Sequence, residues 1–176
     1  MSPFAANLNL IISVFAILAQ ALVLAVIASV VFKKDWHFTR LAKKHGVLLA
    51  FLTALSGTLF SLIYSDIIGF APCELCIIQR VFLYPQVLIL GWLLFKQSVL
   101  ARKIALWLSI IGAAIGAFHY YGQMFNADAL AACETAGISC SKIPFIQFGY
   151  ITIPMLSITA FVLIIALLLS QRSDSK

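Results

Sequence analysis

The four cysteines of this chain form two close pairs, and thiols at such spacings can carry out redox chemistry. Cys73 and Cys76 belong to a Cys-Glu-Leu-Cys motif at the start of a hydrophobic run. Cys133 and Cys140 lie in the polar segment before the last hydrophobic run. A Cys-x-x-Cys motif can alternate between dithiol and disulfide because its sulfurs can meet and its first thiol is often acidified. A second pair offers a partner for disulfide exchange within the same protein.

Two other interpretations of the cysteines remain open at this point. The pairs can form inert structural disulfides, or all four thiolates can bind a zinc ion. Structural zinc sites usually place about two to four residues between the members of each cysteine pair, whereas six residues separate Cys133 from Cys140. The spacing therefore favours redox chemistry, and we predict no resident metal ion.

The composition indicates a protein that resides in a membrane. The chain has 176 residues, of which 63% are hydrophobic and 10% are charged, and its mean hydropathy is +1.07. A soluble domain carries about 25% charged residues. The runs approach the ~20 residues of a helical span and lack the alternation of barrel strands, so we predict an all-α polytopic membrane protein. The predicted spans cover residues 8–32, 46–68, 76–95, 104–122 and 150–169.

The first hydrophobic run is more typical of a membrane anchor than of a cleaved signal peptide. It lacks a preceding basic segment, exceeds the usual ~7–15 apolar residues, and is followed at once by Lys33 and Lys34. We predict that residues 1–45 supply an additional N-terminal transmembrane helix and a basic cytoplasmic loop. Residues 46–176 would then form a four-helix membrane domain with outer cysteine loops.

Basic residues are concentrated on one side of the predicted bundle. Ten of the twelve Lys and Arg residues are Lys33, Lys34, Arg40, Lys43, Lys44, Lys96, Arg102, Lys103, Arg172 and Lys176. Because basic loops mark the cytoplasmic face, we expect the N-terminus outside and the C-terminus in the cytoplasm. Both cysteine pairs would then lie outside, where disulfides persist. The net charge of +6 reflects this asymmetry and does not indicate nucleic-acid binding.

Two further features bear on helix geometry. Pro72 directly precedes Cys73, and proline suits the first turn of a helix. We therefore predict that the motif lies at a helix N-terminus, where the helix dipole favours a thiolate. Gly112 and Gly116 form a Gly-x-x-x-Gly motif, which permits close packing of neighbouring helices.

Three polar residues in the predicted spans are candidates for cofactor binding near the cysteines. Arg80 lies one helical turn after Cys76, and an arginine within a membrane span is a functional candidate. Alternatively, its head group extends into the interface. His119 and Gln123 are one turn apart at the outer end of the fourth run, so they share a face. An interfacial hydrogen bond without chemistry is the alternative for His119.

Three motifs together resemble the DsbB family of disulfide-bond formation proteins, and the short outer loop resembles its BdbC-like branch. They are Pro-Cys-Glu-Leu-Cys-Ile-Ile-Gln-Arg from Pro72, His-Tyr-Tyr-Gly-Gln from His119, and Phe-Gly-Tyr-Ile-Thr-Ile-Pro from Phe148. The resemblance covers about residues 46–169 and includes motif order, spacing and predicted sidedness.

The resemblance implies a quinone-dependent thiol oxidase on a four-helix bundle in the bacterial plasma membrane. Its partner would be a soluble, thioredoxin-like oxidase of the DsbA type, which delivers two electrons. By position, Cys133 would form the mixed disulfide with this partner, and Cys140 would be the second cysteine of the loop pair. The Cys73–Cys76 disulfide would reoxidise this loop pair, with Cys73 facing the loop and Cys76 next to the quinone.

The resemblance also implies residues that contact the quinone, which would be ubiquinone or menaquinone. Arg80 matches the family's quinone-site arginine, and His119 and Gln123 match its polar residues near the quinone. Two features depart from the family pattern. The first hydrophobic run is additional, and the loop between Cys133 and Cys140 is short.

Two rival functions remain. The vitamin K epoxide reductase family also combines two cysteine pairs with a quinone, but its loop pair precedes the Cys-x-x-Cys motif, and the order here is the reverse. A non-catalytic membrane protein with structural outer-face disulfides or a four-cysteine zinc site is the other alternative.

Overall fold

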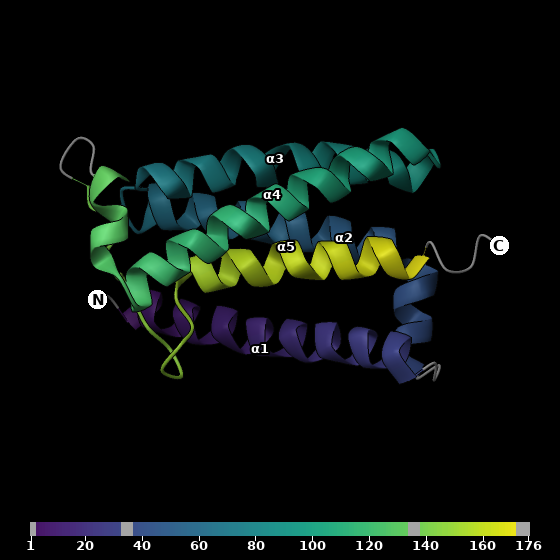
Figure 1. The fold of residues 1–176 in the computed structure, drawn as a ribbon, viewed down its shortest axis with the longest axis horizontal. Helices are drawn as coiled ribbons and strands as arrows, with labels where there is room; N and C mark the ends of the chain where they lie inside the picture. Colours follow the sequence, from purple (N-terminus) through teal and green to yellow (C-terminus); the bar gives the residue numbers. More distant parts are fainter. Residues whose placement is uncertain (1–2, 33–36, 134–137, 172–176) are drawn as a thin grey trace.

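The described residues of the computed structural model, 3–32, 37–133 and 138–171, fold into a bundle of long helices (Figure 1). The helices are α1 (Pro3–Phe32), α2 (His37–Leu62), η1 (Ile63–Ile67), α3 (Glu74–Phe95), α4 (Val99–Met124), η2 (Ala127–Cys133) and α5 (Ile153–Ser170). Within these described ranges, five helical segments are long and apolar enough to cross a membrane. This finding confirms the predicted all-α, polytopic membrane fold.

Several helices extend beyond the hydrophobic runs from which they were predicted. α1 begins at Pro3, and proline suits a first helical turn because the N–H that it lacks would be unpaired there. α2 begins at His37, inside the segment predicted as a basic loop, and departs from helical geometry at His45 (φ −118°, ψ 19°). The kink falls where the basic segment meets the apolar run. Hydropathy therefore locates the part of a helix in the bilayer and not the helix ends.

The four helices α2 to α5 pack in a ring, and α1 is added outside it. α2 packs on α3, α3 on α4, α4 on α5 and α5 on α2. α1 contacts α5 and α2, and it runs alongside α5 in Figure 1. Gln20 of α1 donates a hydrogen bond to Thr159 of α5 (3.0 Å) and accepts one from Tyr150 (2.8 Å). The architecture is thus a four-helix bundle with one additional N-terminal helix.

α4 and α5 approach closely at the Gly-x-x-x-Gly motif. A Cβ atom at Gly112 would overlap the ring of Phe161, and one at Gly116 would lie 3.0 Å from Cγ1 of Ile158. Phe161 is fully buried in the central core. The predicted close packing through these glycines is therefore confirmed. Because His119 lies two turns after Gly112, the same face of α4 directs His119 into the protein.

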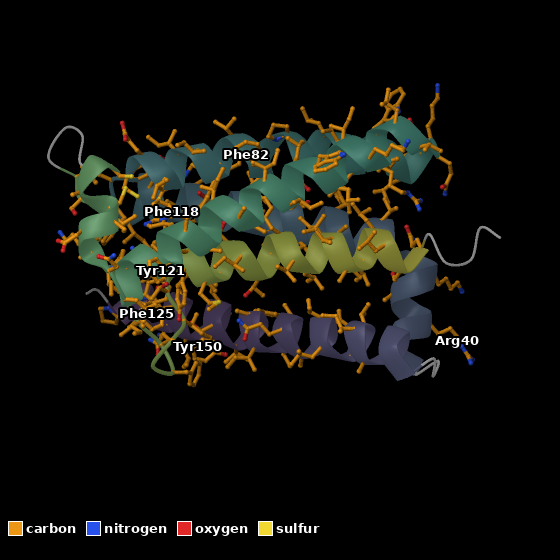
Figure 2. All side chains as sticks on the ribbon, in the orientation of Figure 1. Arg40, Phe82, Phe118, Tyr121, Phe125 and Tyr150 are labelled. Atoms are coloured by element: carbon orange, nitrogen blue, oxygen red, sulfur yellow. The ribbon has the colours of Figure 1, made fainter. Side chains whose placement is uncertain are left out.

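The two ends of the bundle carry different side chains. Figure 2 shows Tyr121, Phe125 and Tyr150 at one end and Arg40 at the other. Tyr121 and Phe125 are exposed and stack with their ring centroids 5.9 Å apart, as aromatic residues do at a membrane interface. The orientation stays a prediction. Some of the basic groups on which it relies lie outside the described residues: Lys33, Lys34, Arg172, Lys176 and the side chain of Lys43.

Candidate active site

The Cys-Glu-Leu-Cys motif forms the first turn of α3. Cys73 is the N-cap residue, with an extended backbone (φ −72°, ψ 170°), and its carbonyl accepts from Ile77 N at 3.0 Å. The predicted position at a helix N-terminus is confirmed. All four cysteines are free thiols, and Cys73 Sγ lies 3.0 Å from Cys76 Sγ. Rotation of the two side chains can therefore close this pair into a disulfide.

The second cysteine pair folds back onto the first. η2 ends at Cys133, and the Cys140 thiol donates to the Cys133 carbonyl at 3.3 Å. Cys140 and Cys73 are both buried and belong to one apolar cluster with Leu75 and Leu130. The sulfurs of Cys140 and Cys73 lie within 4.8 Å of each other. The intervening loop residues 134–137 are outside the described residues.

His119 lies between the two cysteine pairs and is almost completely buried, with 1% of its surface exposed. Its Nε2 atom is 3.1 Å from the Cys140 carbonyl oxygen and 3.9 Å from Cys73 Sγ. Its Nδ1 atom is 3.1 Å from Gln79 Nε2. With the Gln79 amide assigned as donor to Nδ1, Nε2 carries the ring proton and donates to the Cys140 carbonyl. The imidazole is thus aimed at the thiols.

Gln123 ties the Cys140 segment to α4. Its amide nitrogen donates to the carbonyls of Cys140 and Lys142, each at 3.1 Å, and lies 3.4 Å from His119 Nε2. The prediction that His119 and Gln123 share one face is therefore confirmed. Both residues contact the thiol cluster in the described structure. Their predicted contact with a cofactor stays a prediction.

Gln79 is a member of the site that was not identified from the sequence. It is buried and orients the His119 ring through Nδ1. The signal that could have identified it is a polar amide three residues after Cys76 within a predicted span. Buried polar residues within membrane spans are rarely without a partner, but the sequence does not show that Gln79 is buried or that His119 is its partner.

Arg80 projects from α3 toward α2 and is separate from the His119 group in its described contacts. Its guanidinium donates to the Ser61 carbonyl at 3.0 Å. Among the described residues, no carboxylate pairs with it. The neighbouring Ile77 and Val81 are exposed, so this part of α3 is open to the surroundings of the bundle. The structure thus brings together the four cysteines, His119 and Gln123, whereas the hydrogen bond of Arg80 goes to Ser61 on α2.

The thiols outside the membrane-spanning helices have raised pKa values in the reduced state. Hydrogen-bond donation to Cys76, followed by burial, raises the pKa of Cys73 to about 12. Burial raises the pKa of Cys140. Burial, with a contribution from the neighbouring Cys140, also raises the pKa of Cys133. The structure differs here from the expectation of an acidified first thiol, because Cys73 serves as the donor and Cys76 as the acceptor.

Comparison with known proteins identifies the family. The family described as "Disulfide bond formation protein DsbB" matches residues 43–171. Disulfide bond formation protein C of Bacillus subtilis (strain 168) is 40% identical over 128 residues, which cover 71% of this chain and 93% of the relative. The SPbeta prophage-derived disulfide bond formation protein B of the same organism is 39% identical over 138 residues, covering 78% and 92%.

A more distant relative is also described as a disulfide formation protein. The probable disulfide formation protein of Chlamydia caviae is 34% identical over 137 residues, which cover 78% of this chain and 98% of the relative. No solved structure matches this chain. The family match, the extent of the relatives' alignments and the membrane-spanning fold agree. The chain therefore belongs to the DsbB family of disulfide bond formation proteins, which are membrane thiol oxidoreductases that form disulfides.

Proposed function

We propose that this protein reoxidises an extracytoplasmic, thioredoxin-like oxidase of the DsbA type and passes the two electrons to ubiquinone or menaquinone. One observation carries the proposal. The Cys140 sulfur lies within 4.8 Å of the Cys73 sulfur, which lies 3.0 Å from the Cys76 sulfur. Three sulfurs thus form a continuous path from the loop to the start of α3. Disulfide exchange requires this kind of approach of one thiolate to another pair.

The partner enters at Cys133 in this scheme. A thiolate of the reduced partner attacks Cys133 and breaks the Cys133–Cys140 bond, and Cys140 leaves as a thiolate. The second thiol of the partner then attacks the mixed disulfide, so the partner departs oxidised and the loop pair is reduced. The burial of the two residues supports this order, because Cys133 is partly exposed and Cys140 is buried.

Electrons next move from the loop pair to the motif. The Cys140 thiolate attacks Cys73 of the Cys73–Cys76 disulfide and releases Cys76 as a thiolate. Cys133 then attacks Cys140, which restores the loop disulfide and leaves Cys73 as the second thiol. His119 Nε2 is close to Cys73 Sγ (3.9 Å), so the imidazole can supply a proton from Nε2 to this sulfur as it leaves. Two electrons and two protons remain on Cys73 and Cys76.

The residues around Cys76 fit a lipid-soluble acceptor. Cys76 is partly exposed, and the exposed Ile77 and Val81 lie beside it on α3. Arg80 uses one of its five N–H groups on Ser61, so further donors remain for a quinone oxygen. When bound, a quinone supplies the capacity to take up two electrons and two protons. Arg80 would hold its oxygen by a charge-assisted hydrogen bond, and Cys76 would present the reacting sulfur.

The proposal is tested by quinone reduction in purified protein supplied with a reduced thioredoxin-like oxidase. We expect steady quinol formation by the wild-type protein and loss of at least about 100-fold in Cys76→Ser, since the bond to be exchanged is absent. In that variant, the loop disulfide should still oxidise one equivalent of the partner, as measured by thiol trapping. Unchanged quinone reduction by Cys76→Ser would show that the electrons take another route.

A further inference from the structure

Three side chains of the active site are arranged like the ligands of a metal ion. The Sγ atoms of Cys73 and Cys140 and a ring nitrogen of His119 all lie within 4.8 Å of one another, and all three residues are buried. They come from the start of α3, from α4 and from the loop after η2. Around a tetrahedral zinc ion, bond lengths of ~2.0–2.3 Å place neighbouring ligand atoms roughly 3.5–3.8 Å apart. The three ligand atoms would have to approach one another by about 1 Å to bind a single ion.

We propose that the fully reduced protein binds one Zn²⁺ ion through Cys73, His119 and Cys140. Cys76 is not included, because it does not belong to the group whose ligand atoms all lie within 4.8 Å of one another. Three protein ligands leave the fourth position open for water. This site differs from a four-cysteine site because Cys133 does not belong to the ligand group and a histidine does. The proposed zinc site depends on the positions of the two thiols and His119, and it does not depend on quinone binding.

Zinc binding at this site conserves both charge and protons. Each thiol loses its proton to solvent when its sulfur bonds to zinc, and two thiolates neutralise the double charge of the ion. A buried site without net charge avoids the desolvation cost of an isolated ion. Because the metal displaces the two thiol protons, affinity increases as pH rises.

Gln79 is the positioning residue for this site. His119 must offer a lone pair at Nε2, which requires the ring proton at Nδ1, where Gln79 lies 3.1 Å away. Rotation of the Gln79 amide by half a turn presents Oε1 to that proton. Partners of this kind fix the tautomer of a ligating histidine, and their loss lowers metal affinity by about 10–100-fold.

The redox state would control the site. A Cys73–Cys76 disulfide leaves no thiolate at Cys73, so the oxidised protein has lost a ligand. In the reduced protein, the bound metal occupies the sulfurs that must attack and be attacked. Zinc would therefore hold the enzyme in its reduced form and block disulfide exchange until the metal is removed.

The test is a titration of the purified protein in lipid nanodiscs with Co²⁺, followed by displacement with Zn²⁺. We expect the reduced wild-type protein to bind one Co²⁺ with thiolate-to-metal absorption, and the oxidised protein to show none. Cys133→Ser should bind within about threefold of the wild-type affinity, whereas Cys140→Ser and His119→Ala should lose at least about tenfold. The comparison of the reduced with the oxidised wild-type protein does not depend on whether any variant folds.

Two variants of Gln79 separate positioning from a general effect on packing. Gln79→Leu should weaken Co²⁺ binding by about 10–100-fold, and Gln79→Glu should restore it, since a carboxylate accepts from Nδ1. The proposal is overturned if the reduced protein binds no Co²⁺ in a saturable way. It is also overturned if Cys133→Ser loses as much affinity as Cys140→Ser, which would indicate a four-thiolate site. Quinone reduction is measured separately, so failure here leaves the proposed function standing.

Discussion

At the scale of single residues, the site depends on which sulfur is protonated. Cys73 and Cys140 are buried and have raised pKa values, and Cys73 donates a hydrogen bond to Cys76. A thiolate is the attacking species in disulfide exchange. The slowest internal step is therefore expected to involve formation of the Cys140 thiolate, and a ring nitrogen of His119 lies within 4.8 Å of this sulfur.

The first prediction concerns pH. A raised pKa means that Cys140 stays protonated in the range where a free cysteine begins to ionise, and its thiolate fraction grows about tenfold per pH unit below the pKa. The rate at which the reduced loop pair attacks the Cys73–Cys76 disulfide should increase steadily from pH 6 to 9. Rapid acid quench followed by thiol trapping measures it. A rate that is constant over this range would contradict the raised pKa.

The second prediction concerns Arg80. Arg80→Gln should raise the KM for quinone by about 10–100-fold, the size of a lost charge-assisted hydrogen bond. Exchange between the two cysteine pairs should change little, since Arg80 donates to Ser61 on α2. Arg102→Gln, at the start of α4 and away from the cysteines, is the matched control. Equal KM changes in the two variants would exclude a specific role for Arg80.

At the scale of elements, α1 is the addition to the four-helix bundle, and Gln20 connects it to the site. Gln20 bonds to Thr159 of α5 and to Tyr150. Tyr150 in turn accepts a hydrogen bond at its carbonyl from Tyr120, the residue after His119. A tight turn with Phe148 and Gly149 at positive φ precedes it. α1 therefore supports the segment that follows Cys140.

The third prediction follows from this connection. Gln20→Leu removes two hydrogen bonds of about 1 kcal/mol each and should lower the midpoint of thermal unfolding in nanodiscs. The rate of Cys140 attack on Cys73 should also fall, because the loop is held less firmly. Leu24→Ala is the control, since Leu24 is exposed on α1. If both variants behave alike, the polar connection has no specific role.

The sequence predicted the membrane spans but neither the ends of the helices nor their contacts. Hydrophobic runs identified the spans, and Pro72 identified the start of α3. The i, i+4 spacing of His119 and Gln123 identified a shared face. Neither periodicity nor spacing indicates that Arg80 reaches Ser61 on α2 or that Gln79 meets His119, because these contacts depend on how neighbouring helices are rotated.

At the scale of the whole molecule, both cysteine pairs lie at one end of the bundle. Figure 2 shows Tyr121, Phe125 and Tyr150 at one end and Arg40 at the opposite end. Cys140 lies at the end that carries Tyr121, because its carbonyl accepts a hydrogen bond from Gln123, which is within one turn of Tyr121 on α4. The basic residues predict that the Arg40 end is cytoplasmic.

The fourth prediction tests this orientation. In intact cells, a membrane-impermeant maleimide should label reduced Cys133, which is partly exposed. In a variant that lacks the native cysteines, Lys96→Cys should be labelled only after the membrane is permeabilised, because the exposed Lys96 follows the opposite end of α3. Labelling of Lys96→Cys in intact cells would reverse the assigned topology.

The burial of Cys73 and Cys140 affects how readily small thiols can reduce this protein. Small soluble thiols can collide with the partly exposed Cys133, yet the sulfurs of Cys73 and Cys140 are buried in an apolar cluster with Leu75 and Leu130. A protein partner that docks at the loop can hold Cys133 long enough for an exchange, whereas a freely diffusing thiol gains no such residence time. In the proposed relay, the apolar cover would therefore slow the reduction of the Cys73–Cys76 disulfide by small thiols.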